Sequence, residues 1–502
     1  DNGPVAHPVR PESFVEINNF YTATVYEKGA EVIGMLKTLV GDAAYYAALD
    51  LYFDRHDGQA CTIEDWLAVF EEVTGRNLAQ FKRWYSEAGT PRLKVSEDCA
   101  DGTYTLTFEQ HTPPTPGQER KAPRVIPIAV GLLGANGDEV RATQILEMTE
   151  ERQSFTFEGL SGRPVPSILR GFSAPVILQR ETTNAERAFL LAHDTDPFNK
   201  WEAGRALARN GLLAMIRDGA APDDAYLDAV HAMARDDSLD PAFRALALGL
   251  PSQEDLAQSL FDQGATPDPQ AIWEALETLR HAKAERMQDL APRLHAQFQV
   301  TDPYRPDAAQ SGARALANAA LGMITRLDGG AQAQKQYDVA DNMTQQLAAL
   351  SCLLQADKGE AAATAFYDQW RHDRLVIDKW FMLQILHAAP ARAVEVTEAL
   401  TQHPDFTMKN PNRFRATLGA LTMNSAGFHH VSGRGYALLT DWLIRLDPLN
   451  PQTAARMCSA FEAWKRYDTD RQDKMIEQLD RILGTPGLSR DTTEMVARMR
   501  DA

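Results

Sequence analysis

Histidine and cysteine are the side chains that most often bind metals or act as nucleophiles, and their spacing in this chain predicts neither role. None of the 12 histidines has another four residues away, so no helix face carries a His-x-x-x-His zinc pair. His429 and His430 are adjacent, and adjacent side chains point in different directions. The four cysteines form no Cys-x-x-Cys pair, which argues against a thiolate metal site and a disulfide framework. We therefore predict no metal ligands in this chain.

The strongest remaining candidate is the run from Asn18 to Val32, which gathers hydroxyl, carboxylate and amine side chains at the start of a predicted helix. By residue type alone, Tyr26 is more often a buried phenol with one satisfied hydrogen bond than a catalyst. By the same reasoning Glu27 and Lys28 are a solvated pair. Residue types alone therefore favour a structural interpretation of this run.

The composition excludes several classes of function. The 502 residues carry 69 acidic and 51 basic side chains, a net charge of −18, with no polybasic block. This balance disfavours binding to a nucleic-acid backbone and to anionic lipid. No apolar run approaches the roughly 18 residues of a membrane-spanning helix. Together with the scattered cysteines, these features predict a cytoplasmic protein with no nucleic-acid partner and no membrane partner.

The length predicts about three or four domains, and the hydrophobic periodicity divides the chain into three regions. Residues 1–90 show helical spacing with marked ends, for example a Thr62 cap with Asp65 three residues later and Gly75 as a stop. Residues 91–182 change to a period of two, and about seven short strand candidates predict a small β-sandwich. Residues 183–502 are sequential short helices, which we expect to stack as an α-solenoid-like superhelix. The predicted fold class is mainly α with a small β-sandwich.

The run from Tyr21 to Val32, Tyr-Thr-Ala-Thr-Val-Tyr-Glu-Lys-Gly-Ala-Glu-Val, resembles the tyrosine-bearing helix of bacterial aminopeptidase N (alanyl aminopeptidase), a gluzincin zinc metallopeptidase family. The resemblance continues in the same order along essentially the whole chain. Its eight further segments are His7-Pro-Val-Arg-Pro11, Leu51-Tyr-Phe-Asp-Arg-His-Asp-Gly58, Phe81-Lys-Arg-Trp-Tyr-Ser86, Ala88-Gly-Thr-Pro91, Ala340-Asp-Asn-Met-Thr344, Asp378-Lys-Trp-Phe381, Asn410-Pro-Asn-Arg413 and Lys465-Arg-Tyr-Asp468.

This resemblance implies which part of the enzyme each of the three regions corresponds to. Residues 1–90 correspond to the C-terminal helical part of a thermolysin-like catalytic domain, residues 91–182 to a β-sandwich, and residues 183–502 to a helical superhelix. The phenol of Tyr26 is implied to donate a hydrogen bond to the oxygen of the tetrahedral intermediate. A phenol, with an ordinary pKa near 10, remains a donor at neutral pH, and one such donor lowers a barrier by roughly 3–4 kcal/mol.

Four further site residues follow from the resemblance. Tyr21 is implied to wall the pocket for the first substrate side chain, and ordinary packing at the helix entry is its alternative. Glu27 is implied to add negative charge near the free ammonium of the peptide. Arg413 and Arg456 are implied to face an internal cavity and meet the downstream peptide, since a guanidinium pairs well with carboxylate. Their alternative is a structural ion pair between helices.

The chain departs from the family pattern at the metal. The His-Glu-x-x-His zinc motif and the Gly-x-Met-Glu-Asn motif are missing, because the chain opens at Asp1, after the place where they belong. With no initiator Met, it is expected to be cut from something longer. Zinc is therefore expected in the intact enzyme and not in this chain, which is predicted to be inactive alone. The apolar faces around Ile33, Trp66 and Trp84 are expected to pack on the missing half.

Two functions are compatible with the sequence. The first is the C-terminal portion of a zinc aminopeptidase, monomeric when intact, that releases N-terminal residues from peptides and accepts Ala and basic or large apolar side chains. The second is a non-catalytic α-solenoid scaffold that binds a peptide or protein partner. A His-Glu-x-x-His motif in the codons upstream of Asp1 would favour the first, and a start codon directly before Asp1 the second.

Overall fold

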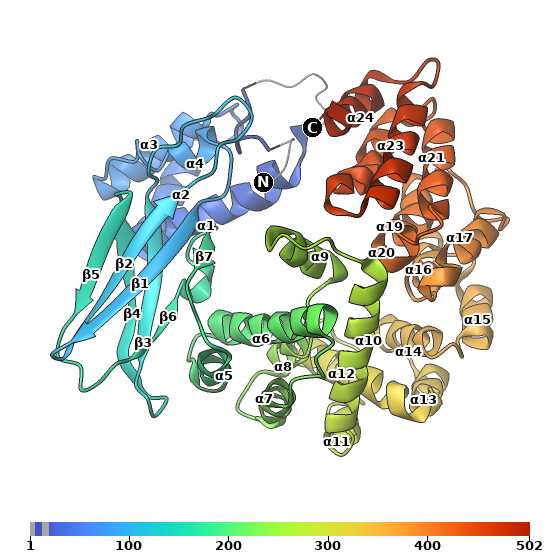
Figure 1. The fold of residues 1–502 in the computed structure, drawn as a ribbon, viewed down its shortest axis with the longest axis horizontal. Helices are drawn as coiled ribbons and strands as arrows, with labels where there is room; N and C mark the ends of the chain where they lie inside the picture. Colours follow the sequence, from blue (N-terminus) through green and yellow to red (C-terminus); the bar gives the residue numbers. More distant parts are fainter. Residues whose placement is uncertain (1–5, 13–19, 502) are drawn as a thin grey trace. The chain divides into compact units, whose positions relative to one another are not determined.

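The computed structural model describes residues 6–12 and 20–501, and it divides into two compact units (Figure 1). The first unit runs to Ala203 and the second from Gly204 to Asp501. The predicted fold class is confirmed, because helices predominate and one small pair of sheets lies in the first unit. No helix among the described residues combines the length and the apolar character that crossing a membrane requires.

The first unit begins with helices whose ends follow from local sequence. Thr62 and Asp65 form a complete capping box, and Gly75 ends the same helix in the left-handed conformation (φ 66°), as predicted. The helical elements are the π-helical turn η2 (Thr24–Lys28), α1 (Gly29–Val40), α2 (Asp42–His56), α3 (Ile63–Thr74) and α4 (Arg83–Ser86).

Two sheets follow, and they form the predicted sandwich from seven strands. One sheet has the order β5-β2-β1-β7 and the other β4-β3-β6, with β1 and β7 as the parallel pair. All eight residues of β3 are buried, which identifies it as the central strand. The strands are β1 (Arg92–Ala100), β2 (Thr103–His111), β3 (Ile126–Leu133), β4 (Glu139–Met148), β5 (Arg152–Phe157), β6 (Val165–Ile168) and β7 (Ile177–Gln179), with a 3₁₀ turn η3 at Arg170–Phe172.

The helices and sheets of the first unit share one hydrophobic core, which contains Val32 and Leu36 of α1 together with Ile128 of β3. Trp84 is fully buried in this core, and its indole N–H donates to the carbonyl of Val125 at 2.8 Å. The expectation that Trp84 faces a missing half of the protein is therefore wrong, because the β-sandwich covers it. Ile33, by contrast, is 37% exposed.

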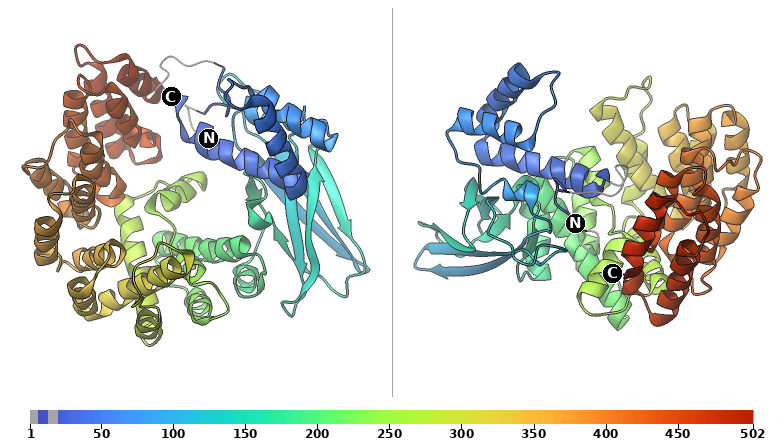
Figure 2. Two further views of the ribbon diagram at one scale, coloured as in Figure 1. Left: turned by 180° about the vertical axis from the view of Figure 1, so that it is seen from behind. Right: turned by 90° about the horizontal axis from the view of Figure 1, so that it is seen from above.

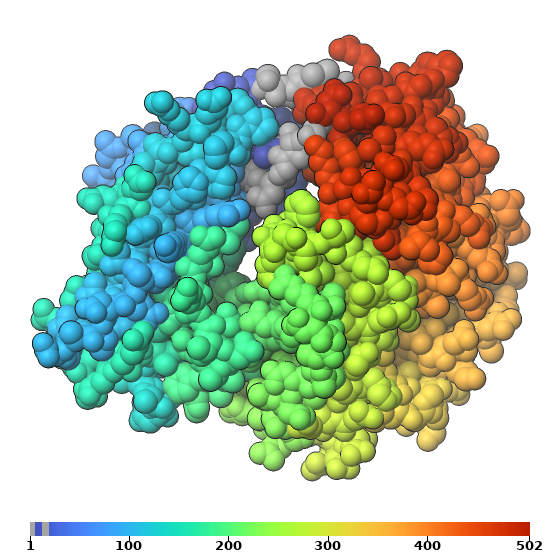
Figure 3. All heavy atoms as spheres, in the orientation of Figure 1, coloured from blue at the N-terminus to red at the C-terminus, as the bar shows by residue number. Residues whose placement is uncertain are grey.

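The second unit is helical throughout its described length. Most helices that are close in sequence lie side by side, as the colours of Figures 2 and 3 show, although the helices Pro269–Arg286 and Ser425–Phe428 are also in contact. α5 (Asn184–His193) precedes this unit, and α6 (Pro197–Asp218) crosses the boundary after Ala203. The elements that follow are α7 (Asp224–Arg235), α8 (Pro241–Ala247), α9 (Gln253–Asp262), α10 (Pro269–Arg286), α11 (Leu290–Gln297), α12 (Ala308–Asp328), α13 (Ala331–Val339), α14 (Met343–Gln355), α15 (Glu360–Trp370), α16 (Arg374–Leu386), η4 (Pro390–Arg392), α17 (Ala393–Thr401), α18 (Pro411–Phe414), η5 (Arg415–Gly419), α19 (Ala420–Met423), α20 (Ser425–Phe428), α21 (Arg434–Leu446), α22 (Pro451–Cys458), η6 (Ser459–Phe461), η7 (Trp464–Arg466), α23 (Thr469–Leu483) and α24 (Arg490–Asp501).

Several aspartates have a structural role at the ends of these helices. An aspartate caps the N-terminus of several of them by accepting hydrogen bonds from backbone N–H groups of the first turn. These capping residues include Asp223, Asp240, Asp268, Asp307, Asp373 and Asp468.

Candidate functional site

Tyr26 lies in a π-helical turn, the element η2, directly before α1. The backbone N–H of Gly29 reaches back to the carbonyl of Thr24, five residues earlier, and the N–H of Tyr26 donates to the carbonyl of Thr22 at 3.1 Å. Thr22 is itself held by a 2.9 Å hydrogen bond between its hydroxyl and the His7 ring. π-helical turns are rare and occur frequently at functional sites.

Two tyrosines, one in the turn and one shortly before it, have exposed side chains. Tyr26 is 58% exposed and Tyr21 is 52% exposed, and their ring centroids lie 6.2 Å apart at an angle of 31°. Glu27 is exposed beside them. The structural reading of Tyr26 as a buried phenol is therefore wrong, and the sequence-predicted residues Tyr21, Tyr26 and Glu27 come from one short surface segment.

Lys28 behaves differently from its neighbour Glu27, and the expectation of a solvated pair is wrong. The ammonium of Lys28 donates to the carbonyl of Gly89 at 3.1 Å. Burial, with a contribution from the nearby Arg124 guanidinium, lowers the pKa of Lys28 to about 7. The turn thus exposes Tyr26 and inserts Lys28 toward the protein interior.

Arg413 is part of a buried contact between helices in the second unit. Its side chain is 5% exposed, and its Nε donates to the carboxylate of Asp378 at 2.5 Å. The guanidinium also donates to the backbone carbonyl of Asp405 and lies over the Phe381 ring. This is the ion pair between helices that was the alternative for this residue, and it opposes the expectation that Arg413 faces a cavity.

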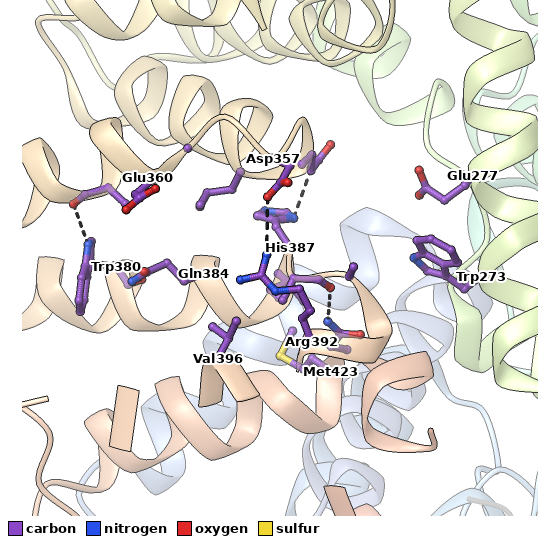
Figure 4. Close-up of a pocket in the computed structure, with 18 of the residues that line it drawn as sticks. Trp273, Glu277, Asp357, Glu360, Trp380, Gln384, His387, Arg392, Val396 and Met423 are labelled. Carbon is purple, nitrogen blue, oxygen red and sulfur yellow. Dashed lines mark hydrogen bonds and ion pairs between the residues drawn. The ribbon is translucent and has the colours of Figure 1, made fainter. Parts of the chain in front are cut away.

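Arg456 has the opposite environment, since it is exposed on α22. Neither arginine lines the cavity of about 1080 Å³ that lies within the second unit (Figure 4). That cavity is lined by charges of both signs: Glu277 pairs with Arg280 and Arg326 at 2.5 and 2.7 Å. Burial and then Arg280 lower the pKa of His387, another lining residue, to about 4, so that its ring is neutral near pH 7.

Metal-binding side chains do not converge in the described part of the chain. Within residues 6–12 and 20–501 no group of three or more His, Cys, Asp or Glu side chains is arranged to hold a metal ion. His429, one of the adjacent histidines, is buried and hydrogen-bonded to the Tyr436 hydroxyl at 2.9 Å.

Arg124, a buried residue near the π-helical turn, was not predicted from the sequence. Arg124, fully buried, donates to the carbonyls of Glu87, Ala88 and Gly89 at 2.9–3.1 Å. Its position after a proline-rich stretch gave no signal of burial. The Ala88-Gly89-Thr90-Pro91 segment did stand out in the sequence, but only as part of a resemblance.

Three domain families match the chain in order. Residues 1–85 match the Peptidase family M1 domain, residues 89–181 match a domain of unknown function with an Ig-like fold (DUF3458), and residues 184–501 match a domain of unknown function with ARM repeats (DUF3458_C).

Curated relatives extend the comparison along the whole chain. Aminopeptidase N from Caulobacter vibrioides is 43% identical over 510 residues, and aminopeptidase N from Escherichia coli is 38% identical over 520 residues. Each match covers 99% of this chain but only 58% and 59% of the relative. The solved structure of Legionella pneumophila aminopeptidase A in complex with aspartic acid superposes with a TM-score of 0.88 at 29% identity, covering 99% of this chain and 58% of that one.

Proposed function

The chain belongs to the aminopeptidase N family, and from this premise we propose that it forms the C-terminal part of a zinc aminopeptidase that releases N-terminal amino acids from peptides. The observation that carries the proposal is the exposed phenol of Tyr26 on a rare π-helical turn, inside the segment that matches the Peptidase family M1 domain. The Legionella relative holds aspartic acid, which is the kind of product that such a reaction releases.

In this function Tyr26 donates its hydroxyl proton as a hydrogen bond to the oxygen that becomes negative when the peptide carbonyl turns tetrahedral. A donor directed at that oxygen stabilises the transition state more than the substrate, so it raises kcat. Tyr21, 6.2 Å from Tyr26 between ring centroids, walls the pocket for the first side chain. Glu27 adds negative charge near the ammonium of the peptide.

Zinc bound in the intact enzyme would supply Lewis-acid chemistry, polarising the peptide carbonyl and lowering the pKa of a water molecule. The described residues do not fit this metal, because no group of three candidate ligands converges among them. Because the full sequence also contains no His-Glu-x-x-His motif, we propose that the zinc ligands and the general base belong to a part of the enzyme outside this chain, and we expect this chain alone to be inactive.

The remaining parts have supporting functions in the proposal. Residues 1–90 carry Tyr26, residues 91–182 support them, and residues 183–502 form a superhelix that admits peptides and excludes folded proteins. Arg456, exposed on α22, contacts the downstream part of the peptide, whereas Arg413 holds helices together. The enzyme is proposed to act on peptides as a cytoplasmic monomer.

The test is Tyr26→Phe in the zinc-containing full-length enzyme. We expect kcat to fall by roughly 10²–10³-fold, with KM and zinc content nearly unchanged, because one oxyanion donor is lost. Tyr304→Phe is the matched control, since Tyr304 is 53% exposed in the helical unit. Near-normal turnover of Tyr26→Phe would remove the catalytic role of Tyr26, whereas a full-length wild-type protein with neither zinc nor turnover would favour the peptide-binding scaffold.

A further inference from the structure

We propose that Lys28 is a positioning residue: its hydrogen bond to the Gly89 carbonyl ties the π-helical turn that carries Tyr26 to the segment 87–89, and so fixes where the Tyr26 hydroxyl lies. This inference rests on the proposed function of Tyr26. It concerns a residue that touches neither substrate nor metal in that proposal.

Three cations converge on three consecutive carbonyls in the first unit. Lys28 donates to Gly89 at 3.1 Å, and Arg124 donates to Gly89, Ala88 and Glu87 at 3.1, 2.9 and 3.1 Å. Lys121 also donates to the carbonyl of Ala88 at 3.1 Å. The carbonyl of Gly89 therefore accepts from both Lys28 and Arg124, and this shared oxygen links the turn to the β-sandwich.

The acceptor is itself fixed in place. Gly89 has a φ of +85°, which L-residues with a side chain rarely adopt. A Cβ at this position would lie 3.1 Å from the methyl groups of both Thr112 and Thr115. Arg124 is fully buried and stacks over the Trp84 ring at 4.9 Å. Lys28 is thus tied to a rigid part of the unit and not to a mobile loop.

Several charged side chains of the described residues meet at these carbonyls. Lys28 faces Arg124 and Lys121, and Glu87 contributes a carboxylate whose Oε2 lies 3.6 Å from the Arg124 Nε. Burial lowers the pKa of Lys28 to about 7 and of Lys121 to about 8. Burying these cations side by side costs solvation free energy, which their hydrogen bonds to the carbonyls offset. We infer that these hydrogen bonds hold the surrounding segments in place.

The position of Lys28 in the chain indicates which segment its hydrogen bond holds in place. Lys28 is the last residue of η2, two residues after Tyr26, so its side chain fixes the end of the turn while Thr22 and His7 fix the start. Without the Lys28 contact the turn is free to return to ordinary α-helical hydrogen bonding. That change would rotate Tyr26, and a displacement of about 1 Å costs on the order of 10²-fold in rate.

The first experiment measures how well the π-helical turn is protected from hydrogen exchange, in this chain alone and without zinc. Amide hydrogen exchange of the peptide covering residues 22–30 is compared between the wild type, Lys28→Met and the control Lys94→Met, an exposed lysine on β1. We expect exchange to be at least about tenfold faster in Lys28→Met only. Gly89→Ala disturbs the carbonyl that accepts the same hydrogen bond, so we expect it to accelerate exchange as well. This variant replaces Lys28→Met if Lys28→Met does not fold. Unchanged exchange in a folded variant would overturn the inference.

The second experiment separates positioning from a general loss of structure. In the full-length zinc enzyme, Lys28→Met is expected to lower kcat by about 10–100-fold with KM within about twofold. Added to Tyr26→Phe, it is expected to lower kcat no further, because it acts through the phenol. Additive losses, or faster exchange with unchanged kcat, would contradict the positioning role. Normal turnover of Tyr26→Phe would instead contradict the proposed function, while the exchange result still decides whether Lys28 holds the turn.

Discussion

Tyr26 and Lys28, two positions apart in the candidate site, have opposite environments. Tyr26 is 58% exposed, whereas Lys28, two residues later, is largely buried and bonded to Gly89. A π-helical turn changes the angular position of successive side chains relative to an α-helix. The expectation of a solvated Glu27–Lys28 pair rested on residue types alone, which do not show that the Lys28 ammonium reaches the carbonyl of Gly89.

The two arginines predicted to meet substrate are expected to differ in stability measurements. Arg413→Met removes one partner of a buried pair and leaves the Asp378 carboxylate, 15% exposed, without its cation. We expect the free energy of unfolding to fall by about 3–5 kcal/mol, measured by urea denaturation. Arg456→Met, on an exposed side chain, should change it by less than about 0.5 kcal/mol. A stable Arg413→Met variant would contradict the structural assignment.

At the scale of elements, the sequence predicted those whose ends have strong local signals. The Thr62 cap, the Gly75 stop and the strands of the sandwich are examples, because caps and alternation depend on neighbouring residues. The π-helical turn, the burial of Trp84 under the sandwich and the Lys28–Gly89 contact were missed. The last two depend on residues far apart in the chain, which no local pattern contains, and the π-helical turn has no cap or alternation that would mark it in the sequence.

The contact of α20 with α21 and α23 predicts a pH dependence of stability. His429 bonds to Tyr436 on α21, and its backbone carbonyl accepts from Arg471 on α23 at 2.7 Å. Burial, followed by Arg471, lowers the pKa of His429 to about 3, compared with about 6.5 in an unfolded chain. Between these values the unfolded chain binds the additional proton, so stability is lost as pH falls below about 6.5 and continues to be lost toward 3.

His429→Gln removes this titration and keeps a polar side chain opposite Tyr436. We expect the slope of unfolding free energy against pH, measured between pH 4 and 6, to decrease by up to about 1.4 kcal/mol per pH unit. His430→Gln is the control, because the His430 ring is partly exposed and bonded to Ser432. Equal slopes in the wild type and His429→Gln would show that other groups carry the acid sensitivity.

At the scale of the whole molecule, the chain matches an enzyme family along 99% of its own length and spans about 58% of its relatives. The family and the fold class could be predicted from the sequence, because they depend on many sequence segments that occur in the same order. Whether a metal site exists depends instead on three or more side chains converging in space. The described residues show no such group, although His, Cys, Asp and Glu side chains occur throughout the chain.

This distribution predicts how the chain responds to zinc. A metal that binds only the folded state raises the unfolding temperature, because binding adds to the free energy of unfolding in proportion to the logarithm of its concentration. We expect neither equimolar zinc nor a chelator to shift the unfolding temperature of this chain beyond the error of calorimetry, and no stoichiometric zinc after gel filtration. The full-length enzyme is the positive control, since removal of its zinc should lower the unfolding temperature. Stoichiometric binding by this chain, with a rise in unfolding temperature, would place a metal site in it and contradict the assignment of the ligands to the rest of the enzyme.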